Sequence, residues 1–301
     1  MALIAGPTAS GKSALALEIA RAHRGVVINA DSAQVYADLR VLSARPSEAE
    51  LAAVPHALYG HVDGAEEYSA ARWAVEARAQ IADAHAAGLL PVVAGGTGLY
   101  LRTLIDGIAP VPEIDPAVRA AVRAMPTAQA HAALAQEDPQ AAARLNAGDT
   151  TRVARALEVV RSSGRTLTSW QRARQGGIGD TVRLLPMILL PDREWLFERC
   201  DRRVEAMIEG GAAEEVEALL ARGDVAASAS VRRAIGVAEI ADWLSGNSTR
   251  EQAVAAMQLA TRQYAKRQYT WFRNQPPADW RRVTESQNAD LMAILAIILR
   301  D

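Results

Sequence analysis

The sequence predicts an α/β protein in which a parallel sheet flanked by helices is interrupted by an all-helical insertion. Three observations lead to this prediction. Short apolar runs alternate with stretches of helical periodicity as far as Gly107, which is typical of parallel strands joined by right-handed crossovers. A glycine-rich loop follows the first apolar run. From Gly107 to about Gly179 only helical periodicity is found, so this stretch is expected to contain no strand.

The first elements follow from the spacing of apolar residues. Leu3-Ile4-Ala5 and Val26-Val27-Ile28 are short β-branched or aliphatic runs that predict buried strands. The intervening residues 13–22 place leucine, isoleucine and alanine at helical spacing. A longer amphipathic helix is expected at 69–87, ending at a glycine, and a third strand at 91–94.

Three prolines between 110 and 116 mark the start of the helical insertion. Alanine-rich helices are expected within it at 117–125 and 149–162. A strand returns at 182–190, followed by helices near 193–222, 230–245 and 249–273. The chain is therefore expected to comprise a core segment 1–112, a helical insertion 113–178 and a second core segment 179–301.

Composition narrows the class of protein. Half of the 301 residues are hydrophobic and 23% are charged, as in ordinary globular domains. With a net charge of −2, any nucleic-acid contact requires a local basic patch. A single cysteine, Cys200, argues against a disulfide scaffold or cysteine-rich metal site and favours the cytoplasm. No apolar run reaches the roughly 18 residues of a membrane span, and the N-terminal segment predicts no signal peptide.

The glycine-rich loop carries the most specific motif. Residues Gly6-Pro7-Thr8-Ala9-Ser10-Gly11-Lys12-Ser13 match G-x-x-x-x-G-K-[ST] between a predicted strand and helix. Such a P-loop presents backbone N–H groups, a lysine and a hydroxyl that can hold Mg²⁺ to phosphate oxygens. The alternative is a glycine-rich turn with a surface lysine, and in either case the lysine side chain is expected to be exposed at the loop. Only two lysines occur among 33 basic residues, which favours a function for Lys12. The motif indicates a di- or triphosphate without distinguishing them.

Two polar groups follow later strands. Asp31 comes after the second strand and Thr97 after the third, and ligands bind at the carboxyl ends of parallel strands. Asp31 is a candidate general base or Mg²⁺ partner; Thr97 is a candidate at the reacting groups. Each could instead be a helix N-cap. Gln34 could read a base edge or be a solvated residue. The third strand lacks the terminal aspartate of a Walker B motif, so strong ATP hydrolysis is not expected.

Basic residues gather in the C-terminal part. Arg199 and Arg203 lie four apart on a predicted helix and could clamp a phosphate or form a surface pair. Between 262 and 282, six basic residues face one acid, giving a local charge of +5. Interleaved tyrosine, tryptophan and phenylalanine suit RNA, although the same pattern fits a core helix with a solvated face. The basic residues are Arg262, Lys266, Arg267, Arg273, Arg281 and Arg282.

Together these segments resemble the bacterial tRNA dimethylallyltransferase family, which prenylates N6 of the adenine next to the anticodon. The resemblance covers nearly the whole chain, in family order. It is carried by GPTASGKS at 6–13, DSAQVY at 31–36, EEYSAARW at 66–73, GGTGLYL at 95–101, TRVARALEVVRSSG at 151–164 and TRQYAKRQYTWFR at 261–273.

The resemblance implies a P-loop NTPase-like core, a tunnel, Mg²⁺ as cofactor, and dimethylallyl diphosphate and a tRNA anticodon stem-loop as partners of a cytoplasmic monomer. It implies that 6–13 and Arg203 bind the diphosphate, that Asp31 is the general base, and that Lys12 and Thr97 are catalytic. The implied tRNA-binding residues, with Lys266 and Arg267 added from the basic patch, are Asp31, Ser32, Ala33, Gln34, Thr97, Arg119, Thr151, Arg152, Val153, Ala154, Arg155, Arg233, Ala234, Ile235, Gly236, Val237, Ala238, Lys266 and Arg267.

In two segments, the polar side chains differ from those that are usual in the family. Residues 40–46 read RVLSARP where the family usually reads D-I-G-T-A-K-P, and 236–238 read GVA where it reads G-Y-K/R. The alternative functions are a P-loop small-molecule kinase, which would need an arginine-bearing lid over ATP, and a non-catalytic RNA-binding module.

Overall fold

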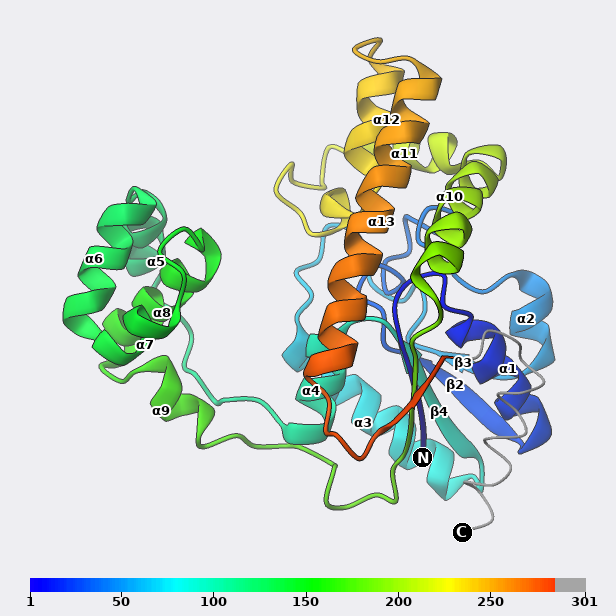
Figure 1. The fold of residues 1–301 in the computed structure, drawn as a ribbon, viewed down its shortest axis with the longest axis horizontal. Coiled ribbons are helices and arrows are strands. Elements are labelled where there is room, and N and C mark those ends of the chain that lie inside the picture. Colours follow the sequence, from blue (N-terminus) through cyan, green and yellow to red (C-terminus); the bar gives the residue numbers. More distant parts are fainter. Residues whose placement is uncertain (285–301) are drawn as a thin grey trace. The chain divides into compact units, whose positions relative to one another are not determined.

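The computed structural model, which describes residues 1–284, contains one six-stranded parallel sheet in that part of the chain (Figure 1). The strand order is β3-β2-β4-β1-β5-β6 and every neighbouring pair is parallel. This confirms the predicted α/β fold class. The strands are β1 (Ala2–Ala5), β2 (Gly25–Asn29), β3 (His56–Ala57), β4 (Leu90–Gly95), β5 (Leu185–Leu189) and β6 (Arg281–Val283).

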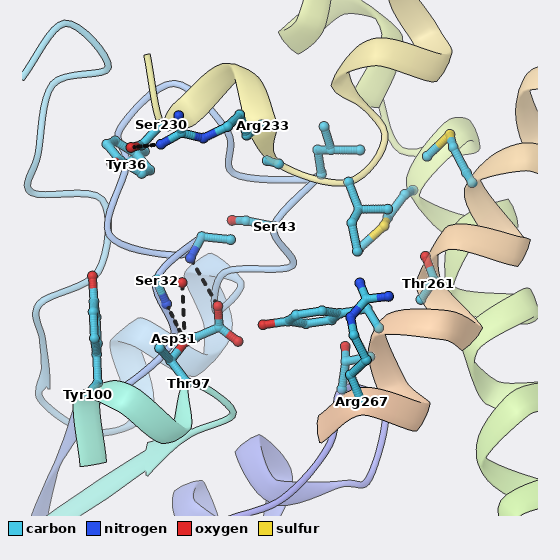
Figure 2. A pocket seen from close by; sticks show the side chains of 18 of the residues that line it. Asp31, Ser32, Tyr36, Ser43, Thr97, Tyr100, Ser230, Arg233, Thr261 and Arg267 are labelled. Atoms are coloured by element: carbon cyan, nitrogen blue, oxygen red, sulfur yellow. Dashed lines mark hydrogen bonds between the residues drawn. The ribbon is translucent and has the colours of Figure 1, made fainter. Parts of the chain in front are cut away.

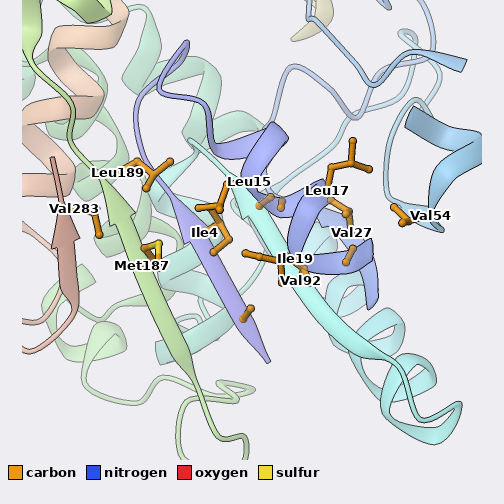
Figure 3. Packing of buried hydrophobic residues seen from close by; sticks show 14 residues of the cluster. Ile4, Leu15, Leu17, Ile19, Val27, Val54, Val92, Met187, Leu189 and Val283 are labelled. Carbon is orange, nitrogen blue, oxygen red and sulfur yellow. The ribbon is translucent and has the colours of Figure 1, made fainter. Parts of the chain in front are cut away.

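The core forms because α1 (Lys12–Ala22) buries one apolar face on the sheet. Leu15 and Ile19 of α1 are fully buried against Ile4 and Val92 of the strands (Figure 3). Successive strand residues point to opposite faces, and the whole of β1 is buried. A strand buried on both faces reads as a continuous apolar run, which is why the sequence located it.

Two predicted helices are interrupted by glycines in the left-handed region. The helix expected at 193–222 is two helices separated at Gly210 and Gly211, where Gly211 has φ +100°. The helix expected at 230–245 divides at Gly236, with φ +101°, into a short 3₁₀ turn and α12. Residues other than glycine rarely adopt this conformation, so a chain that enters it leaves the helix.

Strands β3 and β6 were not predicted, because they contain only two and three residues. The predicted third segment extends to 301, and its last residues, 285–301, lie outside the described part. The remaining helices outside residues 107–178 are α2 (Glu48–Ala53), α3 (Ala70–Ala86), α4 (Gly98–Asp106), α10 (Arg193–Glu209), α11 (Ala212–Ala221), η1 (Val231–Arg233), α12 (Val237–Leu244) and α13 (Arg250–Asn274).

The chain divides into two compact units, residues 1–103 with 179 onward, and Leu104–Ile178. The second unit starts before residue 113, where the insertion was expected, because Ile108 and Gln175 exchange two backbone hydrogen bonds of 3.0 Å that join the incoming and outgoing chain. Its own core centres on Leu134 and Leu157. Its helices are α5 (Pro116–Arg123), α6 (Thr127–Glu137), α7 (Pro139–Arg144), α8 (Thr150–Ser163) and α9 (Leu167–Gln171).

Among the helices that the structure describes, none combines the length and the apolar character needed to cross a bilayer.

Candidate functional site

The loop between β1 and α1 is shaped to receive an anion. Gly11 is the N-cap of α1 at φ +92° and no side chain caps this end, so the first N–H groups of the helix stay available. Only glycine fits at position 6, because a Cβ there would lie 2.7 Å from the Leu189 carbonyl oxygen. The Ser10 hydroxyl is buried and has no hydrogen-bond partner among residues 1–284. An unpaired buried hydroxyl in this loop suits a phosphate oxygen.

Lys12 is 8% exposed and its Nζ donates to the Pro7 carbonyl at 3.3 Å. The prediction of an exposed lysine is therefore wrong: the loop closes over the side chain. Burial lowers the pKa of Lys12 to about 8, and the nearby Asp31 opposes that shift. Because the buried ammonium group is poorly hydrated, binding of an anion next to it stabilises its charged form.

Two arginines of α10 hold the same loop. Arg199 donates from Nε to the Ala9 carbonyl at 2.9 Å, and Arg203 donates to the Thr8 hydroxyl at 3.0 Å. Burial lowers the pKa of Arg203. Both arginines line a cavity of about 500 Å³ together with Lys12. Both side chains therefore contact the phosphate loop, although Arg199 is exposed, and the clamping of a phosphate by this pair stays a prediction.

The donor set of this cavity fits a hard cation shared with a phosphate. The Ser13 hydroxyl and the Glu50 carboxylate both line it. Within residues 1–284 there is no group of three or more histidine, cysteine, aspartate or glutamate side chains that could hold a metal by itself. Mg²⁺ typically takes one or two protein ligands and completes its shell with water and substrate phosphates.

Asp31 is fixed by the end of β2. The buried Asn29 accepts the Asp31 N–H at 2.8 Å and donates to the Asp31 carbonyl at 3.0 Å. Oδ1 of Asp31 accepts the Ala33 N–H at 3.0 Å, and Oδ2 has no partner among the described residues. The next helix begins only at Glu48, so Asp31 is not a helix N-cap. One carboxylate oxygen orients the group and the other is available to a ligand.

Thr97, in the loop after β4, forms hydrogen bonds with the loop that carries Asp31. Its hydroxyl accepts the Ser32 N–H at 2.9 Å and contacts the Ser32 hydroxyl at 3.2 Å. The approach is close because of Gly95, where a Cβ would lie 2.1 Å from the Ala30 carbonyl oxygen. Figure 2 shows Asp31 and Thr97 on one side of a cavity, and Thr261 and Arg267, both from α13, on the other.

This second cavity has a volume of about 570 Å³, and its lining has an aromatic part and an apolar part. Four tyrosines, Tyr36, Tyr68, Tyr100 and Tyr264, give it aromatic walls, and Tyr100 stacks on Trp73 with ring centroids 4.6 Å apart. Arg203 lines this cavity as well as the phosphate-loop cavity, so the two meet at one guanidinium group. Apolar side chains form a further part of the wall: Leu42, Val204, Met207, Ile235 and Met257.

The divergent segment 40–45 is held through its main chain. The N–H groups of 40–42 donate to the Glu215 carboxylate at 2.7–3.0 Å. The carbonyls of Ser43 and Ala44 accept from Nε2 of Gln34 at 3.0 and 2.8 Å. Gln34 is 9% exposed, so the alternative of a solvated residue is wrong. Its Nε2 already donates twice, and a role in reading a base edge stays a prediction.

The other predicted residues are distributed unevenly. Arg233, Ala234, Ile235 and Arg267 line the second cavity, whereas 236–238 begin α12 and do not. Lys266 is exposed on α13 outside both cavities. In the second unit, Arg119 lies on α5 and 151–155 on α8. Within that stretch the side chain of Val153 is fully buried, and the tRNA contact of the segment stays a prediction. Arg119, Thr151, Arg152 and Arg155 are exposed.

Sequence reasoning missed the tyrosine walls and Gln268. Gln268 is 6% exposed and hydrogen-bonds to both loops of the site. One signal was present: Gln268 lies four residues after Tyr264 and three before Trp271, on a face of α13 that is otherwise apolar or aromatic. A glutamine buried on such a face requires polar partners from elsewhere in the fold.

Comparisons with known proteins agree on one family. A family model described as IPP transferase matches residues 34–275, and one described as isopentenyl transferase matches 1–58. A tRNA dimethylallyltransferase of Sphingopyxis alaskensis is 65% identical over 302 residues, spanning 100% of this chain and 98% of the relative. One of Erythrobacter litoralis is 62% identical, spanning 94% and 90%.

Two solved structures resemble the whole fold. The full-length tRNA isopentenylpyrophosphate transferase of Bacillus halodurans has a TM-score of 0.72 and 32% identity, covering 99% of this chain and 95% of its own. A eukaryotic dimethylallyltransferase acting on tRNA has a TM-score of 0.78 and 31% identity, covering 90% and 69%.

Proposed function

Because the chain belongs to the IPP transferase family, we propose that it transfers the dimethylallyl group of dimethylallyl diphosphate to N6 of the adenine 3′ to the anticodon in tRNA. One observation carries the proposal: two cavities meet at Arg203. One is lined by the phosphate loop and the other by Asp31, Thr97 and tyrosines. This arrangement suits a diphosphate ester on one side and a nucleobase on the other.

The reaction is a displacement at carbon. N6 of the adenine attacks C1 of the prenyl diphosphate, the new C–N bond forms, the C–O bond breaks and diphosphate leaves. The exocyclic amine is a weak nucleophile, so Oδ2 of Asp31 accepts its proton. The Thr97 hydroxyl accepts a hydrogen bond from the Ser32 N–H at 2.9 Å. It lies beside that carboxylate and orients the amine.

Charge builds on the departing diphosphate. The N–H groups at the start of α1, the Lys12 ammonium and the Arg203 guanidinium stabilise it, and fixed donors in a site with little water are especially effective. The Ser13 hydroxyl and diphosphate oxygens would hold a divalent cation, Mg²⁺ in our proposal, which would neutralise further charge there. The apolar part of the second cavity, around Met207 and Met257, excludes water from the five-carbon tail.

A base must leave its stack to enter an enclosed cavity. The tyrosines supply ring faces for the flipped adenine. We assign Arg233 and Arg267 to the surrounding RNA, and residues 113–178 to the anticodon stem-loop. The catalytic unit is a monomer acting in the cytoplasm, where the buried thiol of Cys200 stays reduced.

The reaction itself can be tested by mass spectrometry of tRNA. After incubation with dimethylallyl diphosphate and MgCl₂, we expect adenine next to the anticodon to gain one dimethylallyl group and diphosphate to appear in equal amount. ATP in place of the prenyl donor should give no product, and a tRNA with guanine at that position should stay unmodified. Phosphorylation of a small molecule from ATP, without a mass gain on tRNA, would establish the kinase alternative.

We also expect tRNA binding to weaken steeply with salt. Within 262–282, Arg262 pairs with Asp201 and Arg282 donates to main-chain carbonyls, whereas Lys266 and Arg267 are exposed. Each phosphate contact contributes about 0.7–0.9 to the slope of log K against log salt. Replacing Lys266 and Arg267 by alanine should therefore reduce the slope by about 1–2.

Arg21→Ala provides the matched control for this salt titration. Arg21 is exposed on α1 and pairs with Glu18, so its removal should leave the slope unchanged. A slope unaffected by the double replacement at 266 and 267 would place the tRNA surface elsewhere.

A further inference from the structure

A single buried amide connects the two loops of the site. Gln268 projects from α13, and its Oε1 accepts the Thr8 N–H at 2.7 Å while its Nε2 donates to the Gly96 carbonyl at 2.8 Å. The side chain is 6% exposed. Thr8 belongs to the phosphate loop after β1, and Gly96 to the loop after β4 that carries Thr97.

The second loop is pressed against α13 on both sides of Thr97. A Cβ at Gly96 would lie 2.3 Å from Nε2 of Gln268, and one at Gly98 would lie 2.6 Å from the Trp271 ring. Two glycines are therefore required for this approach. The residues on either side of Thr97 thus pack directly against α13, which ties the position of Thr97 to that of the helix.

Hydrogen bonds continue from this amide in both directions. On one side, Thr8 accepts from Arg203 through its hydroxyl at 3.0 Å. On the other, the loop of Gly96 continues into Thr97, whose hydroxyl accepts the Ser32 N–H at 2.9 Å. A chain of contacts thus runs from the phosphate-binding guanidinium to the residue next to Asp31.

We propose that Gln268 is a positioning residue that couples the two substrate sites: a diphosphate bound at the phosphate loop fixes Thr8 and, through Gln268, fixes the Thr97 loop for the adenine. This inference rests on the proposed function. Coupling of this kind is reciprocal, so diphosphate tightens tRNA binding and tRNA tightens diphosphate binding by the same factor.

The test measures that factor directly. The dissociation constant of a tRNA anticodon stem-loop is determined with and without saturating inorganic diphosphate and MgCl₂. In the wild type we expect diphosphate to tighten binding, within the range of about 5–150-fold that is usual for coupled sites. Gln268→Met keeps the side-chain length and removes both hydrogen bonds. It should reduce the factor to about 1, while each ligand alone binds nearly as in the wild type.

Gln263→Met is the matched control, because Gln263 is exposed on the same helix. Gln268→Glu provides a second variant if the methionine variant does not fold. Its ionised carboxylate can still accept from Thr8 but cannot donate to Gly96, so at a pH where it is ionised it should also uncouple the sites. For kcat, the double variant with Thr97→Ala should lose no more than the worse single variant.

Three results would overturn the inference: an uncoupled wild type, a coupling factor retained in both Gln268 variants, or additive losses in kcat. The prenyl-transfer assay is run on the wild type in parallel. If tRNA is prenylated while the coupling factor is unaffected by Gln268, only this inference fails; if no prenylation occurs, the proposed function fails as well.

Discussion

Replacing Lys12 by methionine is expected to reduce kcat by on the order of 10²–10³ or more, the loss that follows removal of one preorganised group facing developing charge. The ammonium group is buried in the phosphate loop, next to Pro7. Methionine has nearly the same length and no charge. Because burying a charge is costly, the neutral side chain should leave the melting temperature unchanged or raise it.

Alanine at the same position should give the same kinetic loss with a smaller side chain in the loop. Steady-state kinetics and thermal unfolding of both variants separate chemistry from folding. Activity near the wild-type level in a folded Lys12→Met protein would remove Lys12 from the diphosphate site.

The same residue predicts a pH dependence. Burial lowers the pKa of Lys12 to about 8, so in the free enzyme its positive charge is present below that pH and is lost as the pH rises through it. kcat/KM for dimethylallyl diphosphate should therefore fall above about pH 8. Lys12→Arg keeps its charge at high pH, so any activity that it retains should lack this alkaline decline.

Asp31→Asn is expected to lower kcat by on the order of 10²–10⁴, the usual contribution of a positioned general base. The amide can still accept the Ala33 N–H through its oxygen, so the loop should keep its conformation. It cannot take the proton from N6. The measurement is single-turnover prenyl transfer with the dissociation constant of tRNA determined in parallel.

Binding of tRNA to Asp31→Asn should remain within a few-fold of the wild type. Ser32→Ala is a suitable comparison, because Ser32 lines the same cavity but its side chain is not assigned to proton transfer. If the asparagine variant loses tRNA binding and keeps its kcat, Asp31 is an RNA contact and the proton has another acceptor.

The local elements of the core could be predicted from the sequence because each leaves a local pattern. The strands at β1, β2 and β4 are continuous apolar runs, and the phosphate loop has fixed spacing. Asp31 and Thr97 could be placed at one sheet edge because parallel strands end there. The two loops are joined by hydrogen bonds between Thr97 and Ser32, the neighbour of Asp31. These bonds depend on the close approach of Gly95 to Ala30, and no local sequence pattern reveals that approach.

What could not be predicted depends on distant segments meeting. Lys12 was expected to be exposed because a lysine in an isolated loop would be; its burial results from the way the surrounding segments close over the loop. Gln268 lies 260 positions from Thr8 in the sequence, and the packing of α13 brings the two residues together. The break at Gly210 and Gly211 was missed because the helical periodicity continues on both sides of it.

The way Glu215 holds residues 40–42 has a consequence for how this family can evolve. The carboxylate binds three main-chain N–H groups, and those groups exist whatever side chains the segment carries. Substitutions of Arg40 and Val41 therefore leave these contacts in place, and only Leu42 is also held by a buried side chain, whereas an exchange at 215 removes all three contacts at once. Sequence drift can accumulate on the bound segment while the residue that binds it, far away in the chain, carries the constraint.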